Sequence, residues 1–154
     1  MGGIEIRPVE TDADYEAWRQ VRIAVLPHER CPSVAELREL ETPHRLLLLA
    51  ELDGKVVANG LSDRSSEGGR GFVAPRVRPD ARRRGVGTRM LSALADHAVA
   101  EGYTVAGAGV EDEGSLAFGQ RFGFVETGRQ VEQVRPIARE SRPEAPTAYE
   151  IVTV

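Results

Sequence analysis

The sequence contains very little cysteine and very little lysine. Cys31 is its single cysteine and Lys55 its single lysine, so nearly all of its cations are arginines. A chain with one cysteine can form no internal disulfide and no cysteine-based metal cluster. The three histidines, His28, His44 and His97, lie too far apart in the sequence to indicate a zinc site. We therefore expect neither a disulfide scaffold nor a metal centre.

The sequence also lacks long apolar runs and an excess of positive charge. No apolar stretch approaches the roughly 20 residues needed to span a bilayer, and residues 1–5 carry no apolar signal core. The formal net charge is −4, with 41% hydrophobic and 29% charged residues, which is typical of a globular protein. Nucleic-acid binding requires net positive charge or a broad basic face. We expect one cytoplasmic domain over residues 1–154, with neither nucleic acid nor membrane as a partner.

Hydrophobic periodicity divides the chain into short strands and helices. The expected strands cover residues 4–9, 46–50, 56–58, 72–77, 104–110, 124–125 and 148–154. The expected helices cover residues 12–25, 33–40, 86–101 and 115–121. This order mixes a meander with a crossover, which favours an α/β (α+β) fold rather than a doubly wound parallel sheet. We expect a mixed, mostly antiparallel, twisted sheet of about seven strands flanked by about four helices.

The segment VRPDARRRGVGT, Val77–Thr88, concentrates positive charge at the start of a helix. Three consecutive arginines, Arg82–Arg84, precede Gly85 and Gly87, and an amphipathic helix follows. The first backbone N–H groups of a helix lack partners and the helix dipole adds partial positive charge, so an anion is favoured there. Glycine lets a bulky phosphate approach the backbone, and arginine supplies bidentate donors. The pattern predicts a phosphate or pyrophosphate site.

Two familiar nucleotide-binding motifs do not fit this segment. The dinucleotide fingerprint G-x-G-x-x-G would require glycine at Met90, which lies on the apolar helix face. A P-loop would require a lysine after its second glycine, and the segment has none. The pattern that does fit is Arg82-x-x-Gly85-x-Gly87, an example of [QR]-x-x-G-x-[GA].

With VRP before it, this signature resembles the acetyl-CoA-binding motif of the GNAT N-acetyltransferases. The later segment EDEGSLAFGQRFGFVETGR, residues 111–129, resembles the second motif of that family. The resemblance implies a GNAT-like fold and acetyl-CoA as cosubstrate. In the family, the turn holds the CoA pyrophosphate and the preceding strand pairs with pantetheine. The cofactor-binding residues that it implies are Val77, Arg78, Arg82, Arg83, Arg84, Gly85, Val86, Gly87, Thr88 and Ser115.

The catalytic groups are less well defined than the cofactor site. Many family members have a tyrosine, the general acid for the leaving thiolate, where this chain has Gly119. A general base must take a proton from the amine, and the strand 72–77 contains no acid. We favour Glu111 as the base, with Asp112 and Glu67 as alternatives. Asp112 could equally cap the following helix, as could Ser115.

The resemblance implies transfer of an acetyl group from acetyl-CoA to a primary amine of a small molecule or a peptide or protein N-terminus. The amine would attack directly within a ternary complex. The alternative is a non-catalytic acyl-CoA-binding module, degenerate or one half of a tandem pair. The loop 26–33, which contains His28 and Cys31, and the segment after Val134 would build the acceptor pocket. A homodimer could form through the final strand, residues 148–154.

Overall fold

The computed structural model describes residues 2–131 of the chain. The chain divides into two compact units, Met1–Glu111 and Asp112–Val154. The final strand expected at residues 148–154 and the segment after Val134 lie outside the described residues. A single domain spanning residues 1–154 therefore stays a prediction.

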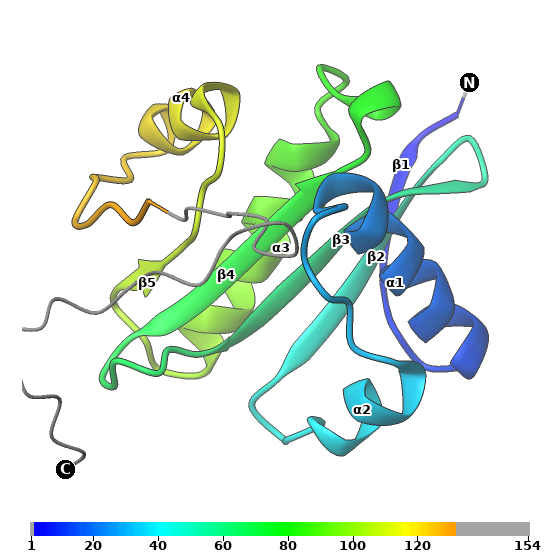
Figure 1. The fold of residues 1–154 in the computed structure, drawn as a ribbon, viewed down its shortest axis with the longest axis horizontal. Coiled ribbons are helices and arrows are strands. Elements are labelled where there is room, and N and C mark those ends of the chain that lie inside the picture. The colour runs from blue at the N-terminus through cyan, green and yellow to red at the C-terminus, as the bar shows by residue number, and fades with distance from the viewer. Residues whose placement is uncertain (1, 132–154) are drawn as a thin grey trace, which may run out of the picture. The chain divides into compact units, whose positions relative to one another are not determined.

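The first unit contains a mixed five-stranded sheet whose strands follow one another in chain order, as Figure 1 shows. The strands are β1 (Ile4–Pro8), β2 (Leu46–Leu52), β3 (Lys55–Arg64), β4 (Gly71–Val77) and β5 (Ala106–Gly107). The helices are α1 (Asp12–Val25), α2 (Val34–Glu39) and α3 (Val86–Ala100), with α4 (Glu113–Arg121) in the second unit. Strands β1 to β4 pair antiparallel, and β5 runs parallel to β4. The predicted mixed, mostly antiparallel fold class is confirmed.

Two strand predictions differ from the structure. The strand expected at residues 104–110 is reduced to β5, which pairs with β4 at two positions only. The strand expected at residues 124–125 is wrong, because Phe124 donates its backbone N–H to Gly119 O and completes the end of α4. Gly123 has a φ of 84° and donates to Gln120 O in the same cap. The described residues thus contain five strands rather than about seven.

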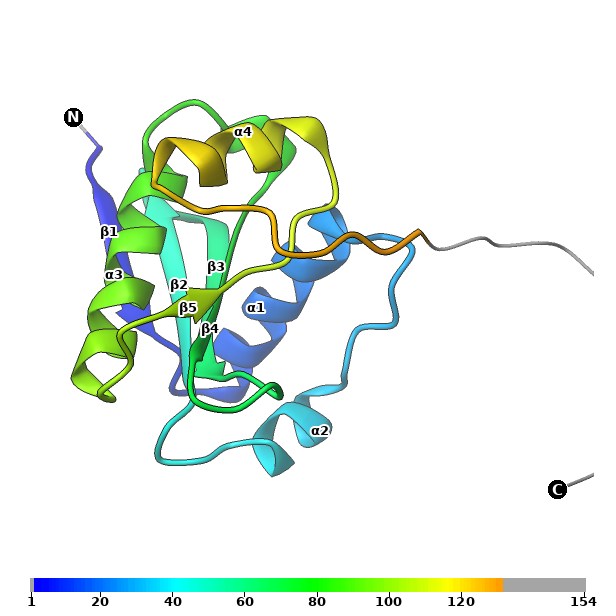
Figure 2. The ribbon, with the colours of Figure 1, turned by 90° about the vertical axis from the view of Figure 1, so that its left-hand side faces the viewer.

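Helix α3 packs on one face of the sheet, and α1 packs on the other (Figure 2). The close approach of α3 to the sheet favours glycine on β3, because a Cβ at Gly60 would lie 2.5 Å from the Met90 sulfur and 3.1 Å from Leu94. Met90 and Leu94 are both fully buried. The face of the sheet that carries Gly60 and its neighbours in register is therefore the α3 face.

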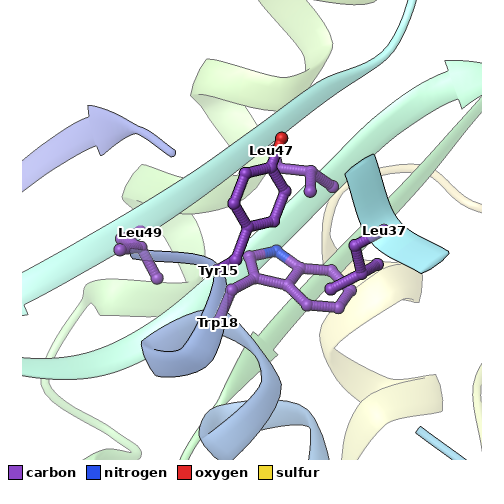
Figure 3. Packing of buried hydrophobic residues seen from close by; sticks show 5 residues of the cluster. All are labelled: Tyr15, Trp18, Leu37, Leu47 and Leu49. Carbon is purple, nitrogen blue, oxygen red and sulfur yellow. The ribbon is translucent and has the colours of Figure 1, made fainter. Parts of the chain in front are cut away.

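The opposite face is covered by an aromatic and aliphatic cluster from α1, α2 and β2, shown in Figure 3. Its buried members are Tyr15, Trp18, Leu37, Leu47 and Leu49. The Trp18 indole N–H donates to Gly60 O at 3.1 Å. Trp18 is 2% exposed and belongs to the core.

Asp14 joins the end of β1 to the start of α1. Its carboxylate accepts the backbone N–H groups of Glu10 and Thr11 and the guanidinium of Arg7, at 3.0, 3.2 and 2.8 Å. The Glu10 N–H and then Arg7 lower the pKa of Asp14 from 3.8 to about 2. A depressed carboxylate pKa stabilises the folded state above the unfolded pKa, and this stabilisation is lost as the pH falls through the folded pKa.

We expect Asp14→Asn to lower the free energy of unfolding by about 2 kcal/mol at pH 7. The difference from wild type should shrink between about pH 4 and pH 2, where the wild-type carboxylate becomes protonated. Urea denaturation at several pH values measures the free energy of unfolding of each protein and its dependence on pH. The control is Asp12→Asn, whose exposed carboxylate pairs with exposed Arg38 and should contribute less than about 0.5 kcal/mol. An equal loss of unfolding free energy in Asp14→Asn and Asp12→Asn would contradict the stabilising role of the Asp14 carboxylate.

Candidate functional site

The N-terminus of α3 differs from those of the other helices in the described part of the chain. Side chains of Thr11, Ser33 and Asp112 cap α1, α2 and α4, respectively. The cap of α3 is Gly85, with a φ of 82° and no side-chain hydrogen bond. The first N–H groups of a helix have no partners within it. The start of α3 thus leaves backbone donors available to an anion.

The arginine turn, Arg82–Thr88, brings positive charge to the same place. Arg82, Arg83 and Arg84 are all exposed. The Arg82 side chain donates to Val77 O at 3.1 Å, which ties the turn to the end of β4. Arg83 has a φ of 66°, an uncommon conformation for a residue other than glycine, and such local strain is concentrated at ligand-binding sites. Val86 is 1% exposed and anchors the turn in the core.

The edge of β4 that faces away from β3 is mostly unpaired within residues 2–131. Strand β5 covers this edge only at Gly71 and Phe72. Arg78 donates its N–H to Val57 O and Gly71 donates to Val105 O, so alternation along the strand points the backbone groups of Val73, Pro75 and Val77 away from β3. We call this stretch, Val73–Val77, the open edge.

Only part of the open edge is accessible. Val73 is 1% exposed, whereas Pro75 and Val77 are partly exposed. Proline has no backbone N–H, so Val77 supplies the N–H donor of this accessible stretch. Both backbone groups of Arg78 bond within the chain, its N–H to Val57 and its carbonyl to Ala81. The strand thus offers an extended ligand the N–H of Val77 and the carbonyl of Pro75.

Arg76 carries the charged side chain of β4. From the sequence it is one of a group of neighbouring arginines, and no role of its own was assigned to it. The guanidinium lies 5.9 Å from the centre of the Trp18 ring, on the face opposite α3. Burial lowers the pKa of Arg76, the charge of Arg22 lowers it further, and the carboxylates of Glu29 and Glu111 partly offset both effects. The sequence feature that could have drawn attention to Arg76 is that it is the single charged residue in the strand GFVAPRV.

The structure brings several sequence candidates close to Arg76. Glu111 and Cys31 both act electrostatically on its guanidinium, although they are far apart in the sequence. The loop that contains Cys31 is held in place from α1, where Arg19 donates to Pro32 O and Arg22 donates to Arg30 O, at 2.6 and 2.8 Å. The predicted acceptor loop and the predicted base therefore lie near one strand. His28 is exposed in the same loop.

The remaining acidic and hydroxyl candidates have structural partners. Asp112 caps α4 and accepts the Ser115 N–H at 2.6 Å, so the alternative of a helix cap is confirmed for Asp112. Ser115 belongs to the second unit, and its predicted contact with the cofactor stays a prediction. Glu67 pairs with Arg70 in the turn before β4, at the end of the strand distant from Val77. Within residues 2–131, no three metal-ligating side chains are grouped to hold a metal ion.

The comparisons with known proteins concern the family and the fold of the chain. The family model described as "Acetyltransferase (GNAT) family" matches residues 7–124. No curated protein sequence matches the chain significantly. Within the described part of the chain, no helix has the length and apolar character needed to cross a membrane.

Three solved structures illustrate the likeness. The aminoglycoside 6'-N-acetyltransferase AAC(6')-Ih from Acinetobacter baumannii is 25% identical, with a TM-score of 0.69, and the alignment covers 88% of this chain and 100% of that one. The aminoglycoside N-acetyltransferase AAC(6')-Iy in complex with CoA is 21% identical, with a TM-score of 0.67 over 88% and 96% of the two chains. The ribosomal-protein-S18-alanine N-acetyltransferase from Escherichia coli is 20% identical, with a TM-score of 0.65 over 82% and 80%. Since the family model matches well over half of its 154 residues, the chain belongs to the GNAT acetyltransferase family.

Proposed function

We propose that the chain binds acetyl-CoA and transfers its acetyl group to a primary amine. The observation that carries this proposal is the uncapped N-terminus of α3 behind three exposed arginines. The N–H groups of Val86, Gly87 and Thr88 would bind the pyrophosphate, since α3 provides no acceptor for them. Arg83 and Arg84 would neutralise its charge. Membership of the family and the likeness to a CoA complex support this assignment.

The open edge of β4 gives the pantetheine arm a strand to follow. An extended chain with amide groups can pair with an unpaired strand edge. The N–H of Val77 and the carbonyl of Pro75 are the accessible partners, directly beside the arginine turn. Pantetheine bound there would run along β4 towards its centre. The thioester would then lie near Pro75 and Arg76.

The proposed reaction is a direct attack of the amine on the thioester carbonyl. The nitrogen forms a bond to the carbonyl carbon, the carbon–sulfur bond breaks, and the sulfur leaves as CoA thiolate. Glu111 would take the proton that the attacking amine loses. The tyrosine that many family members use as the acid is replaced by Gly119 in this chain, so the thiolate would take its proton from water. No covalent intermediate with the protein is required.

A second candidate is a non-catalytic acyl-CoA-binding module. Two observations favour it: Pro75 removes a backbone N–H from the centre of the open edge, and Gly119 carries no hydroxyl. Each removes a group that could stabilise charge as the thioester reacts. Both candidates share the same cofactor site, and turnover distinguishes them.

We expect Glu111→Gln to lower kcat about 100-fold at pH 7, the loss typical of removing a general base, without changing the Kd of acetyl-CoA. A panel of primary amines serves as substrates, and a thiol reagent that detects free CoA measures kcat. Calorimetry measures the Kd of acetyl-CoA. The matched control is Glu67→Gln, at the distant end of β4. If Glu67→Gln alone abolished turnover, the base would be misassigned. Tight acetyl-CoA binding with no turnover for any amine would support the non-catalytic candidate instead.

A further inference from the structure

Arg76 is a partly buried cation without a charged partner among residues 2–131. Its Nη1 atom is buried and has no hydrogen-bond partner within residues 2–131. No described carboxylate approaches it within ion-pair distance, although ten arginine–carboxylate pairs occur elsewhere in the described residues. Its guanidinium carbon lies over the Trp18 ring, 5.9 Å from the ring centre. A buried cation without an anion is costly.

A second polar atom without a partner lies opposite Arg76. Asn59 on β3 pairs in register with Arg76 on β4. The Asn59 amide N–H donates to Trp18 O at 2.7 Å, whereas its Oδ1 atom is buried and has no partner within the described residues. Two unsatisfied polar groups therefore lie side by side on the α1 face of the sheet. Buried polar groups are normally paired, so such exceptions call for a specific explanation.

The neighbouring charges do not neutralise Arg76. Arg22 is nearby, but its charge is balanced by Glu29 at 3.1 Å. Glu29 and Glu111 attract the Arg76 guanidinium only from a distance. The environment accordingly favours the arrival of one further negative charge. A carboxylate matches the planar guanidinium with two parallel hydrogen bonds.

The position of Arg76 relates this charge preference to the proposed reaction. Arg76 lies between Pro75 and Val77 in β4, so it is one residue from both accessible backbone groups of the open edge. Its side chain points to the α1 face, over Trp18, and the loop with Cys31 is held to α1 by Arg19 and Arg22. The carboxylate of Glu111 acts electrostatically on the Arg76 guanidinium. A molecule bound to Arg76 could present an amine both to Glu111 and to a thioester on the edge.

We propose that Arg76 binds a carboxylate of the acceptor, so that the substrate is a small amine that also carries a carboxylate group. This inference rests on the proposed acetyltransferase function. It separates this chain from its structural neighbours that acetylate aminoglycosides, because a polyamine without an acidic group would be repelled by an unpaired guanidinium. Arg76 is thus a determinant of acceptor specificity, distinct from the cofactor-binding turn.

The test compares amines that differ only in the carboxylate. The probes are L-amino acids of each side-chain class, their matched primary amides, and the aminoglycoside sisomicin. Calorimetry with and without CoA measures binding, and release of CoA from acetyl-CoA measures turnover. We expect the wild type to bind at least one amino acid about 10-fold or more tightly than its amide, in line with the strength of a charge-assisted hydrogen bond. Sisomicin should not bind.

Arg76→Gln should reduce the preference for the carboxylate to less than about twofold, while the Kd of acetyl-CoA remains unchanged. Arg64→Gln, which removes an exposed arginine from the end of β3, is the matched control and should behave as wild type. A preference that survives in Arg76→Gln, equal binding of acids and amides, binding of sisomicin, or no binding of any amino acid by the wild type would overturn the proposal. If acetyl-CoA fails to bind, the proposed function fails, and the carboxylate preference without CoA still decides the role of Arg76.

Stability separates a binding role from a structural one. If Arg76 awaits a ligand, Arg76→Met should raise the thermal midpoint of the ligand-free protein, because the substitution removes an unpaired buried charge. If Arg76 and Asn59 instead satisfy each other through a bridging water, the same substitution should lower the midpoint, and the proposal would be overturned.

Discussion

Gly87→Glu is expected to raise the Kd of acetyl-CoA by about 1000-fold or more, a loss of about 4 kcal/mol. Gly87 is the second residue of α3, within the first turn, whose N–H groups have no acceptor in the helix. A glutamate there would place a carboxylate beside the proposed pyrophosphate position and neutralise part of the positive charge of the arginine turn. Both effects oppose the binding of a second anion.

The fold should tolerate this substitution, because an acidic side chain in the first turn of a helix interacts favourably with the helix dipole. Circular dichroism therefore checks that binding is lost without unfolding. Ser92→Glu is the control, since Ser92 is an exposed residue farther along the same helix and the change in charge is identical. Calorimetry should show wild-type affinity for Ser92→Glu. Equal binding by Gly87→Glu and wild type would mean that the cofactor site lies elsewhere.

Trp18→Ala is expected to lower the free energy of unfolding by about 4 kcal/mol, within the range for large-to-small changes in a core. Trp18 is 2% exposed and packs in the cluster with Tyr15 and Leu37 between α1, α2 and β2 (Figure 3). Its removal leaves a cavity and also leaves Gly60 O without the indole donor. Urea denaturation followed by circular dichroism measures the change, because this chain has no other tryptophan to report by fluorescence.

Trp18→Phe separates the packing from the hydrogen bond. Phenylalanine keeps an aromatic ring in the cluster but loses the donor to Gly60 O, so we expect a smaller loss of about 2 kcal/mol. Val99→Ala serves as a control because Val99 is 71% exposed on α3, and its change should be less than about 0.5 kcal/mol. A loss below about 1 kcal/mol for Trp18→Ala would contradict the assignment of Trp18 to the central core.

The features that the sequence predicted correctly depend on neighbouring residues in the chain. Thr11 with Asp14 and Ser33 with Glu36 form the capping boxes that begin α1 and α2. The glycine at 85 has the positive φ angle that the start of α3 requires. Such signals need only a few consecutive residues, because caps and turns are stabilised by local hydrogen bonds. The helices and the arginine turn could therefore be located before the structure was known.

Strands after α3 could not be predicted in the same way. A strand exists only where a partner accepts its backbone hydrogen bonds, and residues 104–110 find such a partner at two positions alone. Phe124 has the composition of a strand residue, but its N–H completes the cap of α4. The alternation of apolar residues does not reveal which competing acceptor a backbone N–H will use.

The sequence by itself determined the family resemblance, the helices and the prediction that the turn at Arg82–Thr88 binds an anion. Only the tertiary structure decided which backbone groups of β4 stay accessible, and that Arg76 lies over Trp18 without a charged partner among residues 2–131. The physical reason is that burial and pairing depend on residues distant in the chain. The environment of Arg76 is formed by α1, β3 and the loop with Cys31 together. No local sequence pattern in β4 predicts that these segments pack around Arg76.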